Sequence, residues 1–137
     1  MKKLSILIAD DNEVNQDLLS AYLKPYPIKL YYVSNGLQAI DFFEKFPELD
    51  LVLMDLNMPV LNGFEALHRI KKCRPAVPVI AITGYPWKYS MDETVYAGFD
   101  AYLEKPLTSR LLISAIASLL PDEGARIIRE IYSGRTK

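Results

Sequence analysis

The sequence predicts an α/β fold, a doubly wound five-stranded parallel sheet with helices on both faces. Short apolar runs, such as residues 6–9 and 79–82, alternate with longer stretches whose apolar residues recur at helical spacing. The short runs are apolar almost throughout, which is typical of parallel strands buried on both faces. Four of these runs lead into polar residues, which are Asp10 with Asp11, Asp55, Thr83 and Lys105.

The first two strand and helix pairs occupy residues 4–46. A strand is predicted over 4–9, and Asn12 is a suitable N-cap for the helix that follows. That helix is indicated by apolar residues at helical spacing, which are Val14, Leu18, Leu19 and Leu23. Pro25 and Pro27 end it. A second strand is predicted over 29–33 and a helix over 37–46. The residues of this helix that are expected to face the core are Ala39, Ile40, Phe43 and Phe46.

The same alternation continues to residue 120. The predicted ranges are a strand over 51–54, a loop over 56–62 and a helix through Ile70, a strand over 78–82, a helix over about 88–97, and a strand over 101–103. Gly98 is a suitable left-handed stop for the fourth helix. The last helix is indicated by Leu111, Leu112, Ile116, Leu119 and Leu120.

Right-handed crossovers leave few ways to wind five parallel strands, and the flavodoxin-like order 2-1-3-4-5 is a common one. In that order the first and third strands are neighbours, so Asp10, Asp11 and Asp55 would lie side by side. Ligands of such sheets bind outside the carboxyl ends of the strands. We therefore expect the three carboxylates, Thr83 and Lys105 to form one site.

Three neighbouring carboxylates repel one another unless they hold protons or share a cation. Ligands that are all oxygen favour Mg²⁺ or Mn²⁺ over zinc. A carboxylate can also accept a phosphoryl group as an acyl phosphate. Lys105 and the Thr83 hydroxyl would then contact the phosphoryl oxygens, where charge gathers during phosphoryl transfer.

Composition limits the other classes of function. The chain has 137 residues, a formal net charge of -1 and one cysteine, Cys73. This indicates one cytoplasmic domain over 1–120, with no nucleic-acid partner, no disulfide framework and no membrane insertion. We expect residues 121–137 to be a C-terminal extension, either a short helix or a linker. Its basic residues are too few to indicate DNA binding, and it contains no recognition-helix motif.

Several short motifs occur in a fixed order along residues 4–120. They are Ala9-Asp10-Asp11-Asn12-Glu13-Val14-Asn15, Met54-Asp55-Leu56-Asn57-Met58-Pro59, Gly63, Thr83-Gly84 and Lys105-Pro106. Each motif is weak alone, but together they make the chain resemble the receiver domains of two-component response regulators. The first motif is similar to receivers of hybrid histidine kinases.

The resemblance implies that Asp55 accepts a phosphoryl group from a histidine kinase or a histidine phosphotransfer protein. It assigns to Mg²⁺ the ligands Asp11, Asp55, the backbone carbonyl of Asn57 and, through a water, Asp10. Thr83 and Lys105 would contact the phosphoryl group, and Tyr102 would rotate to couple Thr83 to an output face. The Lys105-Pro106 bond is expected to be cis, as cis bonds are mainly a proline feature.

The chain also departs from the family pattern near the expected site. Gly84 stands where alanine is commoner, and its small size leaves the site open. Tyr85 is bulky and is followed by Pro86, which restricts the backbone of both residues. In the family this position and that of Asn57 influence how fast water removes the phosphoryl group. We expect Tyr85 to screen water partly and self-dephosphorylation to be slow to moderate.

Other interpretations remain open from the sequence alone. The same fold can serve as a pseudo-receiver, an interaction module that needs no phosphate. Taken singly, Thr83 could be an ordinary strand end, Tyr102 a core residue, and Trp87 with its tyrosines a partly packed loop. An enzyme is disfavoured, because a nucleotide binder needs a phosphate loop where the acidic residues stand. A haloacid-dehalogenase phosphatase would need a second acid at Asn12. The output partner is not indicated.

Overall fold

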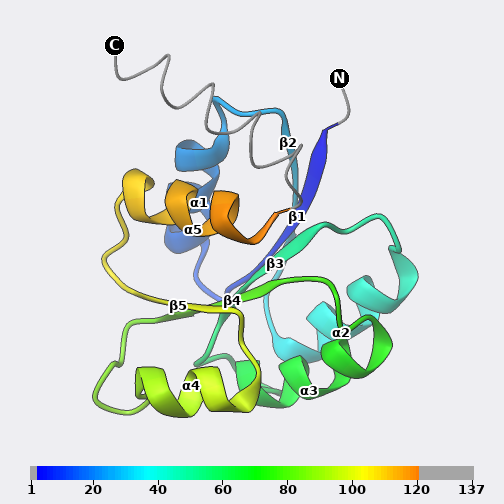
Figure 1. Cartoon of the computed structure of the whole chain (residues 1–137), viewed down its shortest axis with the longest axis vertical. Helices are drawn as coiled ribbons and strands as arrows, with labels where there is room; N and C mark the ends of the chain where they lie inside the picture. The colour runs from blue at the N-terminus through cyan, green and yellow to red at the C-terminus, as the bar shows by residue number, and fades with distance from the viewer. Residues whose placement is uncertain (1–2, 121–137) are drawn as a thin grey trace.

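The computed structural model describes residues 3–120 and contains a five-stranded sheet in the order β2-β1-β3-β4-β5 (Figure 1). All neighbouring strands pair in parallel, which confirms the predicted fold class. The elements are β1 (Leu4–Ala9), α1 (Glu13–Leu23), β2 (Ile28–Val33), α2 (Gly36–Lys45), β3 (Leu51–Asp55), α3 (Gly63–Cys73), β4 (Val79–Thr83), α4 (Met91–Ala97), β5 (Ala101–Glu104) and α5 (Ser109–Leu119).

The sheet separates two apolar cores. Helices α1 and α5 lie on one face, and α2, α3 and α4 lie on the other (Figure 1). Alternate residues of β1 enter opposite cores, so that Ile6 and Ile8 pack with α1 and α5, whereas Leu7 and Ala9 pack against α2 and α3. Burial on both faces explains why the strands are apolar almost throughout.

Short polar side chains begin every helix within residues 3–120. Each N-cap side chain accepts a hydrogen bond from the backbone N–H three residues later, and these residues are Asn12, Asn35, Asn62, Ser90 and Thr108. Asn62 and Glu65 also form a reciprocal capping box. Gly98 ends α4 with a φ of 115°, which confirms the predicted left-handed stop.

The predicted start of the fourth helix was wrong by three residues. Residues 85–88 form a turn in which the N–H groups of Lys88 and Tyr89 both donate to the Tyr85 carbonyl, and Ser90 then caps α4. Pro86, inside this segment, has no N–H to donate. The helix is short as a result. Among residues 3–120, no helix has the length and apolar character that a bilayer span requires.

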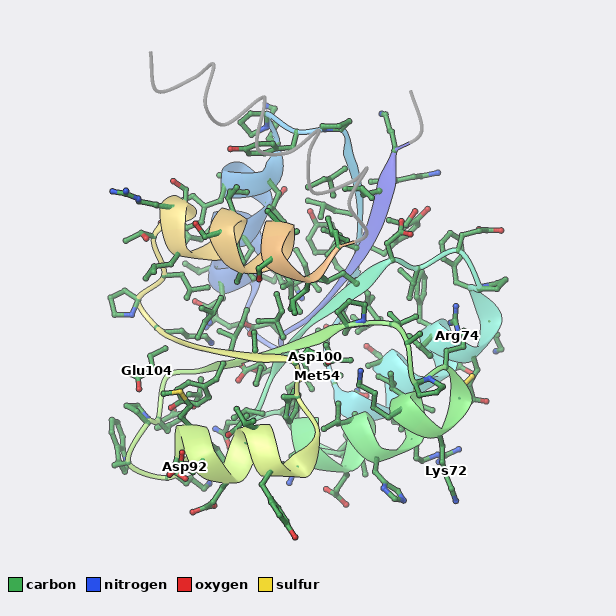
Figure 2. All side chains as sticks on the ribbon, viewed as in Figure 1. Met54, Lys72, Arg74, Asp92, Asp100 and Glu104 are labelled. Atoms are coloured by element: carbon green, nitrogen blue, oxygen red, sulfur yellow. The ribbon has the colours of Figure 1, made fainter. Side chains whose placement is uncertain are left out.

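Charged side chains at the amino ends of the strands are bound to the backbone. Asp50 accepts a hydrogen bond from the Ser5 N–H at 2.8 Å. Asp100 accepts one from the Val79 N–H at 2.8 Å and pairs with Lys71 at 2.7 Å. Arg74, at the end of α3, donates to the carbonyls of Phe43, Phe46 and Pro47 near the end of α2. Asp100 and Arg74 are labelled in Figure 2.

Candidate phosphoacceptor site

Three strand ends at the carboxyl edge of the sheet fold back in the same way. At each, an oxygen of the last or next residue accepts the backbone N–H two residues later, as in Asx and Ser/Thr turns. The bonds run from Asn12 N to Asp10 Oδ1 (2.9 Å), from Asn57 N to Asp55 Oδ1 (3.0 Å) and from Tyr85 N to Thr83 Oγ1 (2.9 Å). These local turns fix the three side chains, and two of them, Asp10 and Asp55, meet at Lys105.

Lys105 connects the two buried carboxylates. Its Nζ lies 3.3 Å from Asp10 Oδ2 and 3.3 Å from Asp55 Oδ2. The backbone N–H of Lys105 donates to the Thr83 carbonyl at 2.8 Å, which fixes the end of β5 beside β4. The Lys105-Pro106 peptide bond is cis, as expected from the resemblance.

Burial dominates the electrostatics of Asp55. Asp10 is 2% and Asp55 6% exposed. Burial raises the pKa of the Asp55 carboxyl from 3.8 to about 6, although the Asn57 N–H and the Lys105 ammonium lower it. The Asp10 carboxylate adds a further, smaller upward contribution to this pKa. One ammonium therefore does not offset the cost of holding two carboxylates together out of water.

The same carboxylates can hold a metal ion. One oxygen from each of Asp10, Asp11 and Asp55 lies within 4.8 Å of the others. Two of these residues are buried and Asp11 is exposed, so the cluster is open to solvent on one side. An open set of hard oxygen ligands fits Mg²⁺, which keeps several waters and prefers carboxylates. The structure thus brings the predicted acidic residues together.

The surroundings of the cluster are open on the side of α1. A cavity of about 310 Å³ lies beside Lys105 and Asp10, and its wall is completed by Asn15, Leu18, Leu19, Ile82, Gly84, Pro106 and Leu107. A methyl group added at Gly84 would meet only Lys105 Cδ, at 3.6 Å. The chain therefore leaves space beside Lys105 at Gly84, and the effect of this residue on the site remains a prediction.

Tyr85 and Tyr102 make side-chain contacts with residues of the segment between β4 and α4. Tyr85 is 43% exposed and packs edge-on against Trp87, with ring centroids 5.5 Å apart. The Tyr102 hydroxyl donates to the Tyr89 carbonyl at 3.0 Å and bonds Glu104 Oε1 at 3.3 Å. Desolvation, followed by the Glu104 charge, raises the pKa of Tyr102. Tyr102 is thus bound to the loop before α4.

One residue of the site was not predicted from the sequence. Gln16, in α1, donates through Nε2 to the Asp10 carbonyl at 2.6 Å. A polar residue four positions after an N-cap is common on helix surfaces, so the sequence alone carried no specific signal for this contact.

The comparisons with known proteins agree with this geometry. The profile of the response regulator receiver domain matches residues 6–117. The chain belongs to the receiver domain family. It is 36% identical over 116 residues to the autoinducer 1 sensor kinase/phosphatase LuxN of Vibrio campbellii, covering 85% of this chain and 13% of that protein. The chain therefore spans a small part of that relative.

Two further receivers bear on the site. Two-component response regulator 24 of Arabidopsis thaliana is 33% identical over 117 residues, covering 85% of this chain and 84% of that protein. The receiver domain of a Pseudomonas aeruginosa sensor histidine kinase, solved with magnesium in its active-site cleft, superposes with a TM-score of 0.79. The two sequences are 30% identical, and the superposition covers 86% of this chain and 98% of the Pseudomonas chain.

Proposed function

We propose that Asp55 of this two-component receiver accepts a phosphoryl group from a phosphohistidine on a histidine kinase or histidine phosphotransfer protein. The observation that carries the proposal is the arrangement of Lys105, whose ammonium lies 3.3 Å from both Asp55 and Asp10 at the open edge of the sheet. A lone ammonium between buried carboxylates is suited to contact phosphoryl oxygens that arrive beside Asp55.

In the transfer, a carboxylate oxygen of Asp55 attacks phosphorus in line and the bond from phosphorus to the histidine nitrogen breaks. The imidazole leaves with the electron pair. Lys105 Nζ would donate to the phosphoryl oxygens, and the N–H of Asn57 holds Asp55 Oδ1 while Oδ2 faces Lys105. Bound Mg²⁺ or Mn²⁺ supplies neutralisation of charge, and it would be held by Asp11, Asp55 and the Asn57 carbonyl, with Asp10 acting through a water.

The response to phosphorylation is assigned to Thr83 and Tyr102. Thr83 Oγ1 accepts the Tyr85 N–H, so its own hydrogen can be donated to a phosphoryl oxygen. That shift would free space for Tyr102 to turn inward and to release the Tyr89 carbonyl. The equilibrium between two surfaces on the side of β4 to α5 would then move.

An output partner would dock on the altered surface. Trp87, Met91, Val95 and Tyr96 are exposed there, in α4 and the loop before it. Their exposure supports a protein partner rather than a nucleic acid, since aromatic residues and methionine are enriched in protein interfaces. A cytoplasmic location is part of the proposal and fits the single free thiol, Cys73.

Intact-protein mass after incubation with acetyl phosphate and Mg²⁺ tests the proposal. We expect one phosphoryl gain, which is lost in Asp55→Ala and in chelator. Asp50→Ala is the matched control, because Asp50 precedes the same strand at its opposite end and should leave the gain intact. A folded, Mg²⁺-binding protein that gains no phosphoryl group, even from a phosphohistidine donor, would contradict the proposal and favour the pseudo-receiver.

Self-dephosphorylation is the finer part of the proposal. Tyr85, beside Thr83 and packed on Trp87, would partly screen attacking water, while Asn57 could still orient it. We expect Tyr85→Ala to shorten the lifetime of the acyl phosphate about threefold, which corresponds to a small decrease in the activation free energy of hydrolysis. The rate of phosphate release measures this lifetime. Trp87→Ala separates loss of the tyrosine from loss of its packing partner. An unchanged lifetime in Tyr85→Ala would rule out the screening.

A further inference from the structure

The carboxamide of Gln16 lies between two strand ends. It sits in the second turn of α1 and is half-buried. Its Nε2 lies 2.6 Å from the Asp10 carbonyl oxygen and 3.4 Å from the carbonyl oxygen of Val33, the last residue of β2. Helix α1 is thereby tied to the edge of the sheet where the acidic residues stand.

This contact occurs where the ladder between β1 and β2 stops. The Asp10 N–H still donates to the Val33 carbonyl at 3.1 Å. Beyond Val33 the chain turns into α2, and the Ser34 N–H is bound to Gln38 Oε1 at 2.8 Å. A buried carbonyl without a donor is costly, and Gln16 supplies a donor for Asp10 in place of the ended ladder.

The Asp10 carbonyl belongs to the same planar peptide unit as the Asp11 N–H. The Gln16 bond to Asp10 O therefore orients the peptide plane from which Asp11 departs, and the bond from Asp10 N to Val33 O holds the preceding peptide. Within residues 3–120, the exposed Asp11 carboxylate makes no hydrogen bond or ion pair with another side chain. The position of the Asp11 backbone therefore sets the direction from which its carboxylate reaches within 4.8 Å of the Asp10 and Asp55 oxygens.

We infer that Gln16 is a positioning residue for the divalent cation site, acting on Asp11 through the Asp10 peptide. The inference rests on the cation site of the proposed function but not on phosphorylation of Asp55. Removing the Gln16 donor would let the Asp10–Asp11 peptide rotate, so that Asp11 samples directions away from the cluster. Outer residues that orient metal ligands commonly affect metal affinity by an order of magnitude or more.

The test uses Gln16→Met, which keeps the length of the side chain and adds no charge but cannot donate. Mg²⁺ affinity is measured by calorimetry on the unphosphorylated full chain. We expect the dissociation constant to rise about fivefold, below the range for direct partners of ligands because Gln16 acts through the backbone.

Gln38→Met is the matched control. It removes a similar carboxamide bond near the start of α2, at Ser34. We expect it to leave Mg²⁺ affinity unchanged. In the metal-free protein, amide exchange at Asp11 and Asn12 should quicken in Gln16→Met only, a readout that is independent of any reaction.

The outcomes separate the two proposals. Wild-type Mg²⁺ affinity in a folded Gln16→Met protein, or an equal loss in Gln38→Met, would overturn the role of Gln16. Gln16→Ala supplies the same affinity measurement if the methionine variant does not fold. A wild-type chain that binds Mg²⁺ but is never phosphorylated would count against the proposed function alone. A chain that binds no Mg²⁺ would overturn both.

Discussion

Strand β3 has an aspartate next to each end, and the two carboxylates are held differently. Asp50, before the strand, is half-buried and accepts the Ser5 N–H at 2.8 Å. Asp55, at the other end, is buried, shares Lys105 with Asp10 at 3.3 Å and has its pKa raised to about 6. Strand β5 repeats the contrast, with the paired Asp100 before it and the shared Lys105 after it.

This difference distinguishes charges that stabilise the folded state from charges that lower its free energy of unfolding. At the amino edge Asp50 and Asp100 each accept a backbone N–H, and Asp100 also has its own cation. At the carboxyl edge two buried carboxylates share one ammonium. Buried charges that lack full compensation reduce stability, and they cluster at functional sites.

The largest effect that would test this contrast is the removal of the Asp55 charge. The folded-state pKa lies above the unfolded value, so the favourable contribution of the proton is full below pH 4 and is lost as pH rises through about 6. In metal-free buffer we expect the stability of Asp55→Asn, relative to wild type, to rise by about 2 kcal/mol between pH 4.5 and pH 7.5.

Urea unfolding of both proteins across this pH range measures the difference. Asp50→Asn is the control at the other end of β3, and it should be less stable than wild type because the hydrogen bond from the Ser5 N–H is weakened. A constant difference between wild type and Asp55→Asn would show that burial of the Asp55 charge carries no such penalty.

Addition of Mg²⁺ should reduce the burden at the carboxyl edge. At about ten times its dissociation constant, Mg²⁺ should stabilise wild type by about 1.4 kcal/mol, as mass action requires. Asp55→Asn lacks one ligand charge and should gain much less, whereas Asp100→Asn should gain as much as wild type. Thermal melting with and without Mg²⁺ checks this, and equal gains in all three proteins would place the cation elsewhere.

Neutralising Asp100 should have the opposite sign to neutralising Asp55. Asp100→Asn weakens the bonds to Val79 N–H and Lys71, and we expect a loss of about 1 kcal/mol, because the pair is partly exposed. A gain in unfolding free energy would contradict the contrast between the two edges.

The smallest effect is expected at Gly84. Its environment leaves room for a methyl group beside Lys105 Cδ, so Gly84→Ala should change stability by less than about 0.5 kcal/mol. Gly36→Ala sharpens the point, because a methyl group there would lie 2.2 Å from the Leu61 carbonyl oxygen and should destabilise clearly. Comparable melting temperatures for the two variants would contradict the stated difference in space.

The strands and the gathering of Asp10, Asp11, Asp55 and Lys105 could be predicted because they depend on local pattern and on winding rules. Contacts made by long side chains could not be. Arg74 reaches carbonyls 27 to 31 residues away, and Gln16 reaches a carbonyl 17 residues away. No local sequence pattern specifies such partners. The start of α4 was missed because the turn at Tyr85 uses backbone bonds, which residue types indicate weakly.

Tertiary context also overrode some apolar positions. Val14, Leu18 and Leu111 fit a helical stripe, but each is exposed. The predicted C-terminal extension, residues 121–137, lies outside the described residues, and the boundary of the receiver at 120 remains a prediction. The roles of Asn57, Tyr85 and Tyr102 also remain predictions.

The three i to i+2 turns at Asp10, Asp55 and Thr83 have a consequence for the accuracy of strand pairing. Each turn is encoded by only three residues, so each can form in any register of the sheet. What brings them together is the alignment of Ala9 with Met54 and of Asp55 with Ile82. A slip of β3 by one residue would preserve every turn and yet exchange the faces of its side chains. The apolar faces of β3, which pack in both cores, thus maintain the register that places Asp55 beside Asp10.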